Sequence, residues 1–242
     1  GADNGIGVAT ALALLEMEEG AKLPPLECLF TVDEETGLTG AFALDGNLLQ
    51  GRTMLNLDTE EWGAICIGCA GGGDSQISLP VSYEGAPGDF LSFQLAVEGL
   101  KGGHSGVDIH EYRANAIVLL ASVMVPLTEM GVRIVSVQGG DKTNAIPREA
   151  FATLLLPPEA MADAQIAVAG RTESLRSEYG SLEKDMRVSL VGLEDAPAEC
   201  MSAEAQGNLM GLLRTLPHGA LKYSHTIPGL VETSNNLASV AP

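Results

Sequence analysis

The sequence lacks the features that mark membrane proteins and nucleic-acid-binding proteins. No run of about 18 consecutive apolar residues occurs, so there is no candidate transmembrane helix. Basic residues are scarce: 13 Lys and Arg stand against 32 Asp and Glu, and the formal net charge is −19. Such a charge repels phosphate groups, which argues against nucleic acid or an anionic membrane as a partner. A cation is the more favourable counterpart.

Aromatic residues and cysteines are also few. Only 4% of the chain is aromatic, but 45% is hydrophobic, which is enough to build a core in 242 residues. The four cysteines cannot form a disulfide framework in a chain this long, so we expect reduced, buried thiols. Cys66 and Cys69 have the spacing of a zinc knuckle, but no second ligand pair accompanies them.

The first 71 residues alternate between helix and strand patterns. Helical spacing of apolar residues predicts a helix over residues 5–19. Apolar runs predict buried strands at 26–32 and 53–57, with a short helix at 40–49 between them. This order favours parallel pairing, and we therefore expect an α/β fold whose sheet is too small to be complete.

The pattern changes near Gly71, where we place a domain boundary. Beyond it, longer alternating segments and helical patterns predict a mixture of strands and helices, which is typical of an α+β domain. The predicted strands are 90–100, 132–137 and 151–156, the predicted helices are 112–130, 158–179 and 203–216, and a final β pair covers 221–226 and 231–240.

Three groups of carboxylates stand beside the predicted elements of the first part. Asp3 precedes the first helix, Glu34 and Glu35 follow the first strand, and Asp58 ends the second strand. The carboxyl ends of parallel strands share one crevice, so these acids can meet there. Oxygen ligands suit Mg²⁺, Ca²⁺ or Mn²⁺, and suit zinc only when histidines join them. Taken singly, each acid is better explained as a helix cap, a loop residue or a solvated surface charge.

Six short motifs together resemble a known family. They are GADNGIGVA at 1–9, DEETG at 33–37, NLDTEE at 56–61, CAGG at 69–72, GLKGGHSG at 99–106 and NAIPREAF at 144–151. In this order they resemble the aminoacyl-histidine dipeptidases, which are carnosinase-like members of the two-zinc exopeptidase family. The resemblance implies a partial catalytic domain with a parallel-type sheet over residues 1–71. Residues 72–242 would form an inserted α+β lid domain, incomplete at its C-terminal end.

The resemblance also implies roles for the four acids. Asp3 would bridge two divalent metal ions, foremost zinc, with manganese or cobalt as alternatives. Glu35 would bind one ion and Asp58 the other. Glu34 would be the general base that takes a proton from a metal-activated water.

Two residues of the lid domain would bind the substrate according to the same resemblance. His104 would stabilise the oxyanion, commonly in the active site of the partner subunit of a homodimer, and Asn144 would belong to the same lid site. Gly102, Gly103 and Gly106 around His104 suit a loop that closely approaches a ligand.

Some of the family's metal ligands are missing from this sequence. The family carries a histidine and an aspartate, separated by one residue, upstream of the bridging aspartate, and a further histidine near its C-terminus; neither feature is present. Glu35 and Asp58 would each lack a histidine partner. We therefore expect an internal fragment with weak or no zinc binding and no turnover of its own.

The leading hypothesis is a cytosolic metallo-dipeptidase that hydrolyses unblocked dipeptides, including Xaa-His. Two alternatives stay open: an amidohydrolase of the same superfamily that cleaves N-acyl amino acids, and a non-catalytic peptide-binding or dimerisation module. The motifs around His104 and Asn144 favour the dipeptidase, and the presence of Glu34 argues against loss of catalysis.

Overall fold

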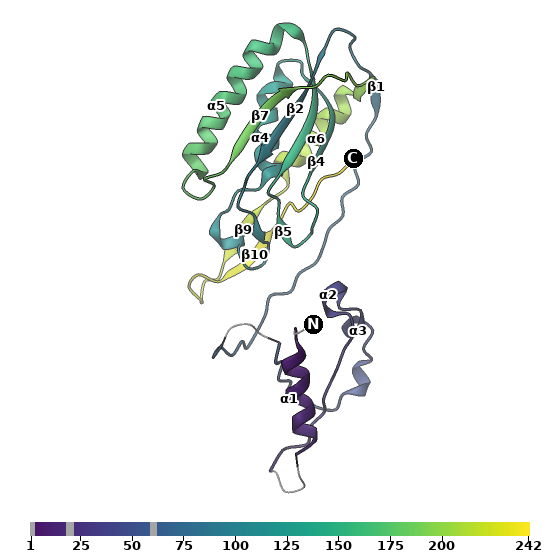
Figure 1. Cartoon of the computed structure of the whole chain (residues 1–242), viewed down its shortest axis with the longest axis vertical. Helices are drawn as coiled ribbons and strands as arrows, with labels where there is room; N and C mark the ends of the chain where they lie inside the picture. The colour runs from purple at the N-terminus through teal and green to yellow at the C-terminus, as the bar shows by residue number, and fades with distance from the viewer. Residues whose placement is uncertain (1–2, 18–21, 59–61) are drawn as a thin grey trace. The chain divides into compact units, whose positions relative to one another are not determined.

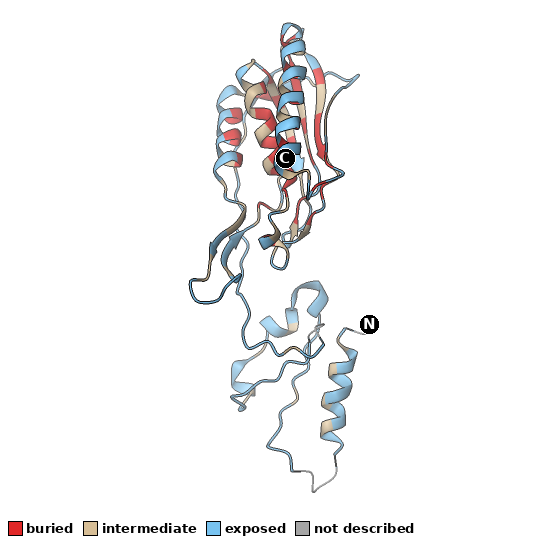
Figure 2. Ribbon diagram, turned by 90° about the vertical axis from the view of Figure 1, so that its left-hand side faces the viewer, coloured by how far each residue is buried: buried red, intermediate tan, exposed pale blue. Residues whose placement is uncertain are grey.

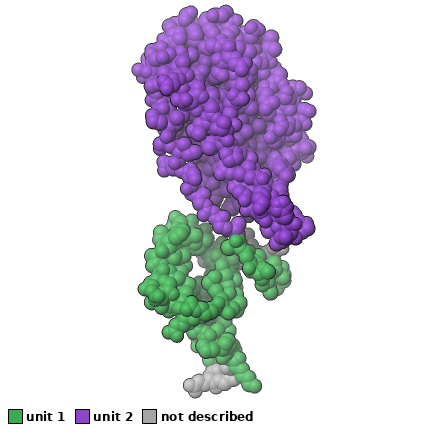
Figure 3. All heavy atoms as spheres, turned by 180° about the vertical axis from the view of Figure 1, so that it is seen from behind, with its two compact units in different colours: residues 1–69 green, residues 70–242 purple. Residues whose placement is uncertain are grey.

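The computed structural model describes residues 3–17, 22–58 and 62–242, and the chain separates into two compact units, residues 1–69 and 70–242 (Figure 3). The buried core belongs to the second unit, where it extends from Leu95 to Leu237. The described residues of the first unit are exposed or half-buried (Figure 2). Burial of apolar side chains therefore stabilises the second unit far more than the first.

A four-stranded antiparallel sheet forms the centre of the second unit (Figure 1). Its order is β4 (Arg133–Gly139), β6 (Ala150–Leu156), β2 (Leu91–Glu98) and β7 (Arg187–Gly192). Side chains alternate between the two faces of a strand, and Leu95 and Val97 of β2 both enter the main core. The strands predicted at 90–100, 132–137 and 151–156 are confirmed as β2, β4 and β6.

Three helices pack against this sheet: α4 (Ala116–Glu129) on β2 and β6, α5 (Met161–Tyr179) on β7, and α6 (Ala203–Thr215) on β4. A short 3-10 helix, η3 (Pro158–Ala160), precedes α5. Buried residues in α5 recur every three or four positions, at Ala164, Val168, Thr172 and Leu175. This spacing gives one buried stripe along the helix. The helices predicted at 112–130, 158–179 and 203–216 are confirmed as α4, α5 and α6.

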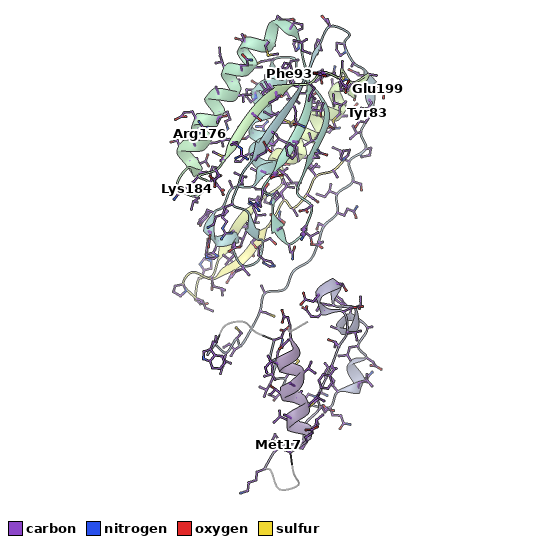
Figure 4. All side chains as sticks on the ribbon, in the orientation of Figure 1. Met17, Tyr83, Phe93, Arg176, Lys184 and Glu199 are labelled. Carbon is purple, nitrogen blue, oxygen red and sulfur yellow. The ribbon has the colours of Figure 1, made fainter. Side chains whose placement is uncertain are left out.

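Short paired strands surround the sheet. They are β1 (Tyr83–Gly85) with β8 (Glu199–Met201), β3 (Gly103–His104) with β5 (Ala145–Ile146), and β9 (Gly219–Tyr223) with β10 (Val231–Asn235). Figure 4 labels Tyr83 and Glu199, which come from the paired strands β1 and β8. A second 3-10 helix, η2 (Ile109–Glu111), lies between β3 and α4 in the chain.

The first unit contains helices but no strand within residues 3–17, 22–58 and 62–69. Its helices are α1 (Gly5–Leu15), α2 (Glu34–Gly37), α3 (Thr39–Phe42) and the 3-10 helix η1 (Gly46–Leu48). The strands predicted at 26–32 and 53–57 are therefore wrong for this structure, and the parallel-type sheet is not formed there. A buried strand requires paired neighbours and covered faces. Here Val32 is 69% exposed and Leu55 is 84% exposed.

The cysteines differ from the prediction of buried thiols. All four are free; Cys200 is buried, Cys28 is half-buried, and Cys66 and Cys69 are exposed. The last two lie in irregular backbone of the first unit, where no sheet covers them. Among the described residues, no helix is long and apolar enough to span a membrane.

Candidate functional site

One side chain connects the segments that carry Asp3 and Asp58. Asn4 caps α1, since its Oδ1 accepts a hydrogen bond from Gly7 N at 2.9 Å. Its Nδ2 donates to the carbonyl oxygen of Leu57 at 3.0 Å. The residue after Asp3 is thus attached to the residue before Asp58. Because Asn4 is the cap, the exposed Asp3 carboxylate has no capping role.

Glu34 and Glu35 begin the short helix α2. Asp33 precedes them with φ of 58°, in the left-handed region, and its Oδ2 accepts a hydrogen bond from Thr39 Oγ1 at 2.9 Å. Gly40 N donates to Val32 O at 3.1 Å, which closes the loop around α2. Both glutamates are exposed. The backbone therefore presents two adjacent carboxylates at a tightly closed loop.

Carboxylates are suitable metal ligands, but these four acids do not form a complete metal site. In the part of the chain that the structure describes, no three His, Cys, Asp or Glu side chains are grouped so that they could hold a metal ion. All four histidines of the sequence lie beyond residue 100, in the second unit. Zinc sites in proteins generally combine carboxylates with His or Cys. The structure brings the Asp3 and Asp58 segments together but does not assemble a ligand set.

The structure does bring His104 and Asn144 together. In the β3–β5 pair, His104 lies opposite Ala145, and Ser105 N donates to the carbonyl oxygen of Asn144 at 2.8 Å. Both His104 and Asn144 are exposed. Two polar residues that are 40 positions apart in the sequence therefore share one exposed corner of the second unit.

Two buried or half-buried residues support this corner, and neither was predicted to do so. Glu183, which is 3% exposed, accepts hydrogen bonds from Lys101 N at 2.7 Å and Ala114 N at 2.9 Å. Asn236 Nδ2 donates to Ala145 O at 2.7 Å. Both act on backbone groups far away in sequence, and residue type and spacing carry no signal of such contacts.

An ion-paired arginine lies beneath the His104 loop. Arg113 donates from Nη1 to Gly102 O at 2.6 Å, from Nη2 to Asp108 Oδ1 at 2.9 Å and from Nε to Glu111 Oε2 at 2.7 Å. The hydrogen bond from Arg113 holds the pKa of the Glu111 carboxyl below its ordinary value. Burial lowers the pKa of His218, and a hydrogen bond between His218 and the Arg113 backbone partly opposes this shift.

Three of the matches to known proteins bear on this chain. Residues 95–181 match the family model of the peptidase dimerisation domain. Over 241 residues the chain is 40% identical to the cytosol non-specific dipeptidase of Escherichia coli (strain K12), covering 99% of this chain and 49% of that protein. The structure resembles the crystal structure of an aminoacylhistidine dipeptidase from Vibrio alginolyticus with a TM-score of 0.85 and 37% identity. That match covers 100% of this chain and 49% of the other.

The chain therefore spans about half the length of the two dipeptidases that it matches. Its mixed α/β fold is that of the corresponding half of the Vibrio structure, and the dimerisation-domain match extends from β2 to the loop after α5. The resemblance to the aminoacyl-histidine dipeptidases that the motifs predicted is thereby confirmed over the whole of this chain.

Proposed function

We propose that this chain is part of a metal-dependent dipeptidase that hydrolyses unblocked dipeptides, Xaa-His among them, in the cytoplasm. The similarity to two dipeptidases over at least 99% of the chain is the observation that supports this most. Each of the four proposed active-site acids and both lid residues is present in its motif. This chain covers 49% of each relative, so the remaining half of such an enzyme would lie outside these 242 residues.

The two parts of the chain would have different tasks. Residues 1–71 would contribute to the catalytic domain, and residues 72–242 would form the lid and the contact between the subunits of a homodimer. The match of residues 95–181 to a peptidase dimerisation domain supports the second assignment. A dipeptide is small, so a lid that closes over it can separate the site from bulk solvent.

The acids of the first unit would divide the chemistry among them. Asp3, Glu35 and Asp58 would hold two divalent ions, with Asp3 shared between them, and ligands from outside these 242 residues would complete the set. Such ions, when bound, supply a water of lowered pKa. Glu34 would hold the proton of that water and pass it to the leaving amine. His104 would donate a hydrogen bond to the oxyanion.

Replacing the proposed base tests this assignment. In the complete protein, we expect Glu34→Gln to lower kcat for a dipeptide by roughly a hundredfold or more, because Gln cannot take up the proton. Its metal content should remain at the wild-type level, whereas Glu35→Gln should lower it. Glu16→Gln, the same change at an exposed position outside the motifs, is the control. Activity of Glu34→Gln within a few-fold of wild type would contradict the role of Glu34.

The chain by itself should not turn over substrate. We expect no hydrolysis of an Xaa-His dipeptide by the 242-residue chain with added zinc, because its carboxylates lack histidine partners. Chromatographic detection of the released histidine is the measurement. Hydrolysis above the zinc-only blank would show that the present ligands suffice. Cleavage of an N-acyl amino acid in preference to dipeptides by the complete protein would favour the amidohydrolase alternative.

A further inference from the structure

The imidazole of His104 is held at one of its two nitrogens. Gly106 N and Val107 N both donate hydrogen bonds to His104 Nδ1, each at 3.1 Å. A ring nitrogen that accepts hydrogen bonds carries no proton, so the neutral ring has its proton on Nε2. Since His104 is exposed, this Nε2–H group is available to a substrate oxygen.

The turn that supplies these two N–H groups is closed by Asp108. His104 N donates to Asp108 Oδ2 at 2.8 Å, and Asp108 N donates to His104 O at 2.8 Å. The other carboxylate oxygen, Oδ1, accepts from Arg113, whose side chain is only 11% exposed. Arg113 also binds Gly102 O, so one guanidinium contacts the backbone before His104 and the side chain after it.

The glycines of the loop are explained by the same contacts. A Cβ atom at Gly103 would overlap the Arg113 guanidinium and the Asp108 carboxylate, and Gly103 has φ of 149°. A Cβ at Gly106 would lie 3.2 Å from His104 Cε1, directly against the ring. The loop's own side chains therefore require glycine at position 103 and leave little room for a side chain at position 106, independently of any ligand.

We propose that Arg113, acting through Asp108, is a positioning residue that fixes His104 as the Nε2–H tautomer and so makes it a hydrogen-bond donor toward the substrate. The catalytic part of this inference rests on the function proposed above. The planar fork of arginine reaches Gly102 O, Asp108 and Glu111 together, whereas the single ammonium group of lysine cannot reproduce that geometry.

A neighbouring histidine provides an internal comparison. His110 Nδ1 lies 3.0 Å from the carbonyl oxygen of Val107, which accepts only. The proton of neutral His110 therefore belongs on Nδ1, the opposite nitrogen to that in His104. His104 and His110 should thus show opposite tautomers. Both are exposed, so solvent exposure alone would not produce this difference.

Nitrogen NMR of the 242-residue chain labelled with ¹⁵N-histidine tests the positioning directly, at a pH where the rings are neutral. In the wild type we expect an Nε2–H pattern for His104 and an Nδ1–H pattern for His110, with His104 assigned by His104→Gln. In Arg113→Lys and in Asp108→Asn, the two nitrogen shifts of His104 should move toward each other as the tautomers average. Arg171→Lys, the same change on α5, should leave them unaltered.

The wild-type spectrum decides first: an averaged or Nδ1–H pattern for His104 would overturn the proposal whether or not the variants fold. Unchanged shifts in folded Arg113→Lys and Asp108→Asn would also overturn it. In the complete protein, Arg113→Lys should lower kcat about tenfold to a hundredfold with little change in KM. The two parts of the inference can fail separately. If kcat is the same in His104→Gln as in the wild type, His104 has no catalytic role. The positioning still stands if Arg113→Lys changes the tautomer of His104.

Discussion

At the scale of single residues, buried polar side chains hold the loops of the second unit in place. Glu183 is an example, because its carboxylate is 3% exposed and satisfies two backbone N–H groups. Leaving such donors unpaired costs about 1–3 kcal/mol each. The corner that carries His104 and Asn144 therefore depends on residues that contact neither side chain.

His218 should make the stability of the second unit depend on pH. Burial lowers its pKa below the ordinary value of 6.5. Above pH 6.5 the ring is neutral in both states; below it the unfolded chain takes up a proton first, so stability falls as the pH drops toward the lower folded pKa. We expect His218→Gln to reduce the loss of melting temperature between about pH 7.5 and about pH 5.5.

Circular dichroism at the two pH values measures this effect. His225→Gln is the control, because His225 is exposed. Glu111, whose pKa is also lowered, acts in the same direction but only below its ordinary value of 4.5, outside this interval. An equal loss of melting temperature in His218→Gln and wild type would contradict the prediction.

At the scale of elements, helix α4 depends on one capping residue with two functions. Asn115 Oδ1 accepts hydrogen bonds from Ile117 N at 3.0 Å and Val118 N at 3.3 Å. Its Nδ2 donates to Leu237 O at 2.9 Å. The same side chain therefore begins the helix and attaches the segment after β10.

Two substitutions separate these functions. Asn115→Ser keeps a capping oxygen but loses the amide donor, and should lower the free energy of unfolding by about 1–3 kcal/mol because Leu237 O is left unpaired. Asn115→Ala loses the capping oxygen as well as the amide donor, and should lower the free energy of unfolding by about a further 1 kcal/mol. Urea unfolding followed by circular dichroism is the measurement. Asn208→Ala on the exposed face of α6 should change little, and equal stabilities of the Ser and Ala variants would exclude a capping contribution.

The elements that could be predicted from sequence are those whose own apolar pattern decides their structure. The alternation of β2, with Leu91, Phe93, Leu95 and Val97 at every second position, is visible without knowledge of its neighbours. The edge strand β7 was missed, because it is half-buried at most and ends in two exposed residues. The strands predicted at 26–32 and 53–57 failed for the opposite reason. Their apolar pattern is suited to a sheet, but strand formation needs partners that the first unit does not supply.

At the scale of the whole molecule, the two units differ in how much apolar surface they bury. All buried hydrophobic residues among those described lie between Leu95 and Leu237. We therefore expect a chain of residues 70–242 to unfold in one cooperative transition, with the midpoint of the 242-residue chain. Scanning calorimetry of both chains is the measurement. A midpoint several degrees lower for residues 70–242 would show that the first unit stabilises the second.

The candidate site was only partly predictable at this scale. The six motifs gave the candidate residues, whose roles stay a prediction, but the proximity of His104 to Asn144 depends on the two-residue pair of β3 and β5, which is too short to leave a pattern in the sequence. Arg113 could not be recognised as a supporting residue, because an Arg among acids resembles a solvated surface group. The positions of Asp3, Glu34, Glu35 and Asp58 as metal ligands and base stay a prediction.

The attachment of residues 236–240 has a consequence for the order of folding. Val240 exchanges two backbone hydrogen bonds with Gly139, and Asn236 binds Ala145, 91 positions away in the sequence. During synthesis, the strand and loop around 139–145 must wait for these later residues to leave the ribosome. Residues 236–240 also follow all four strands of the central sheet and the helices α4, α5 and α6 in the chain. The corner that presents Asn144 is therefore among the last parts of the second unit to mature, after the sheet and helices that carry it.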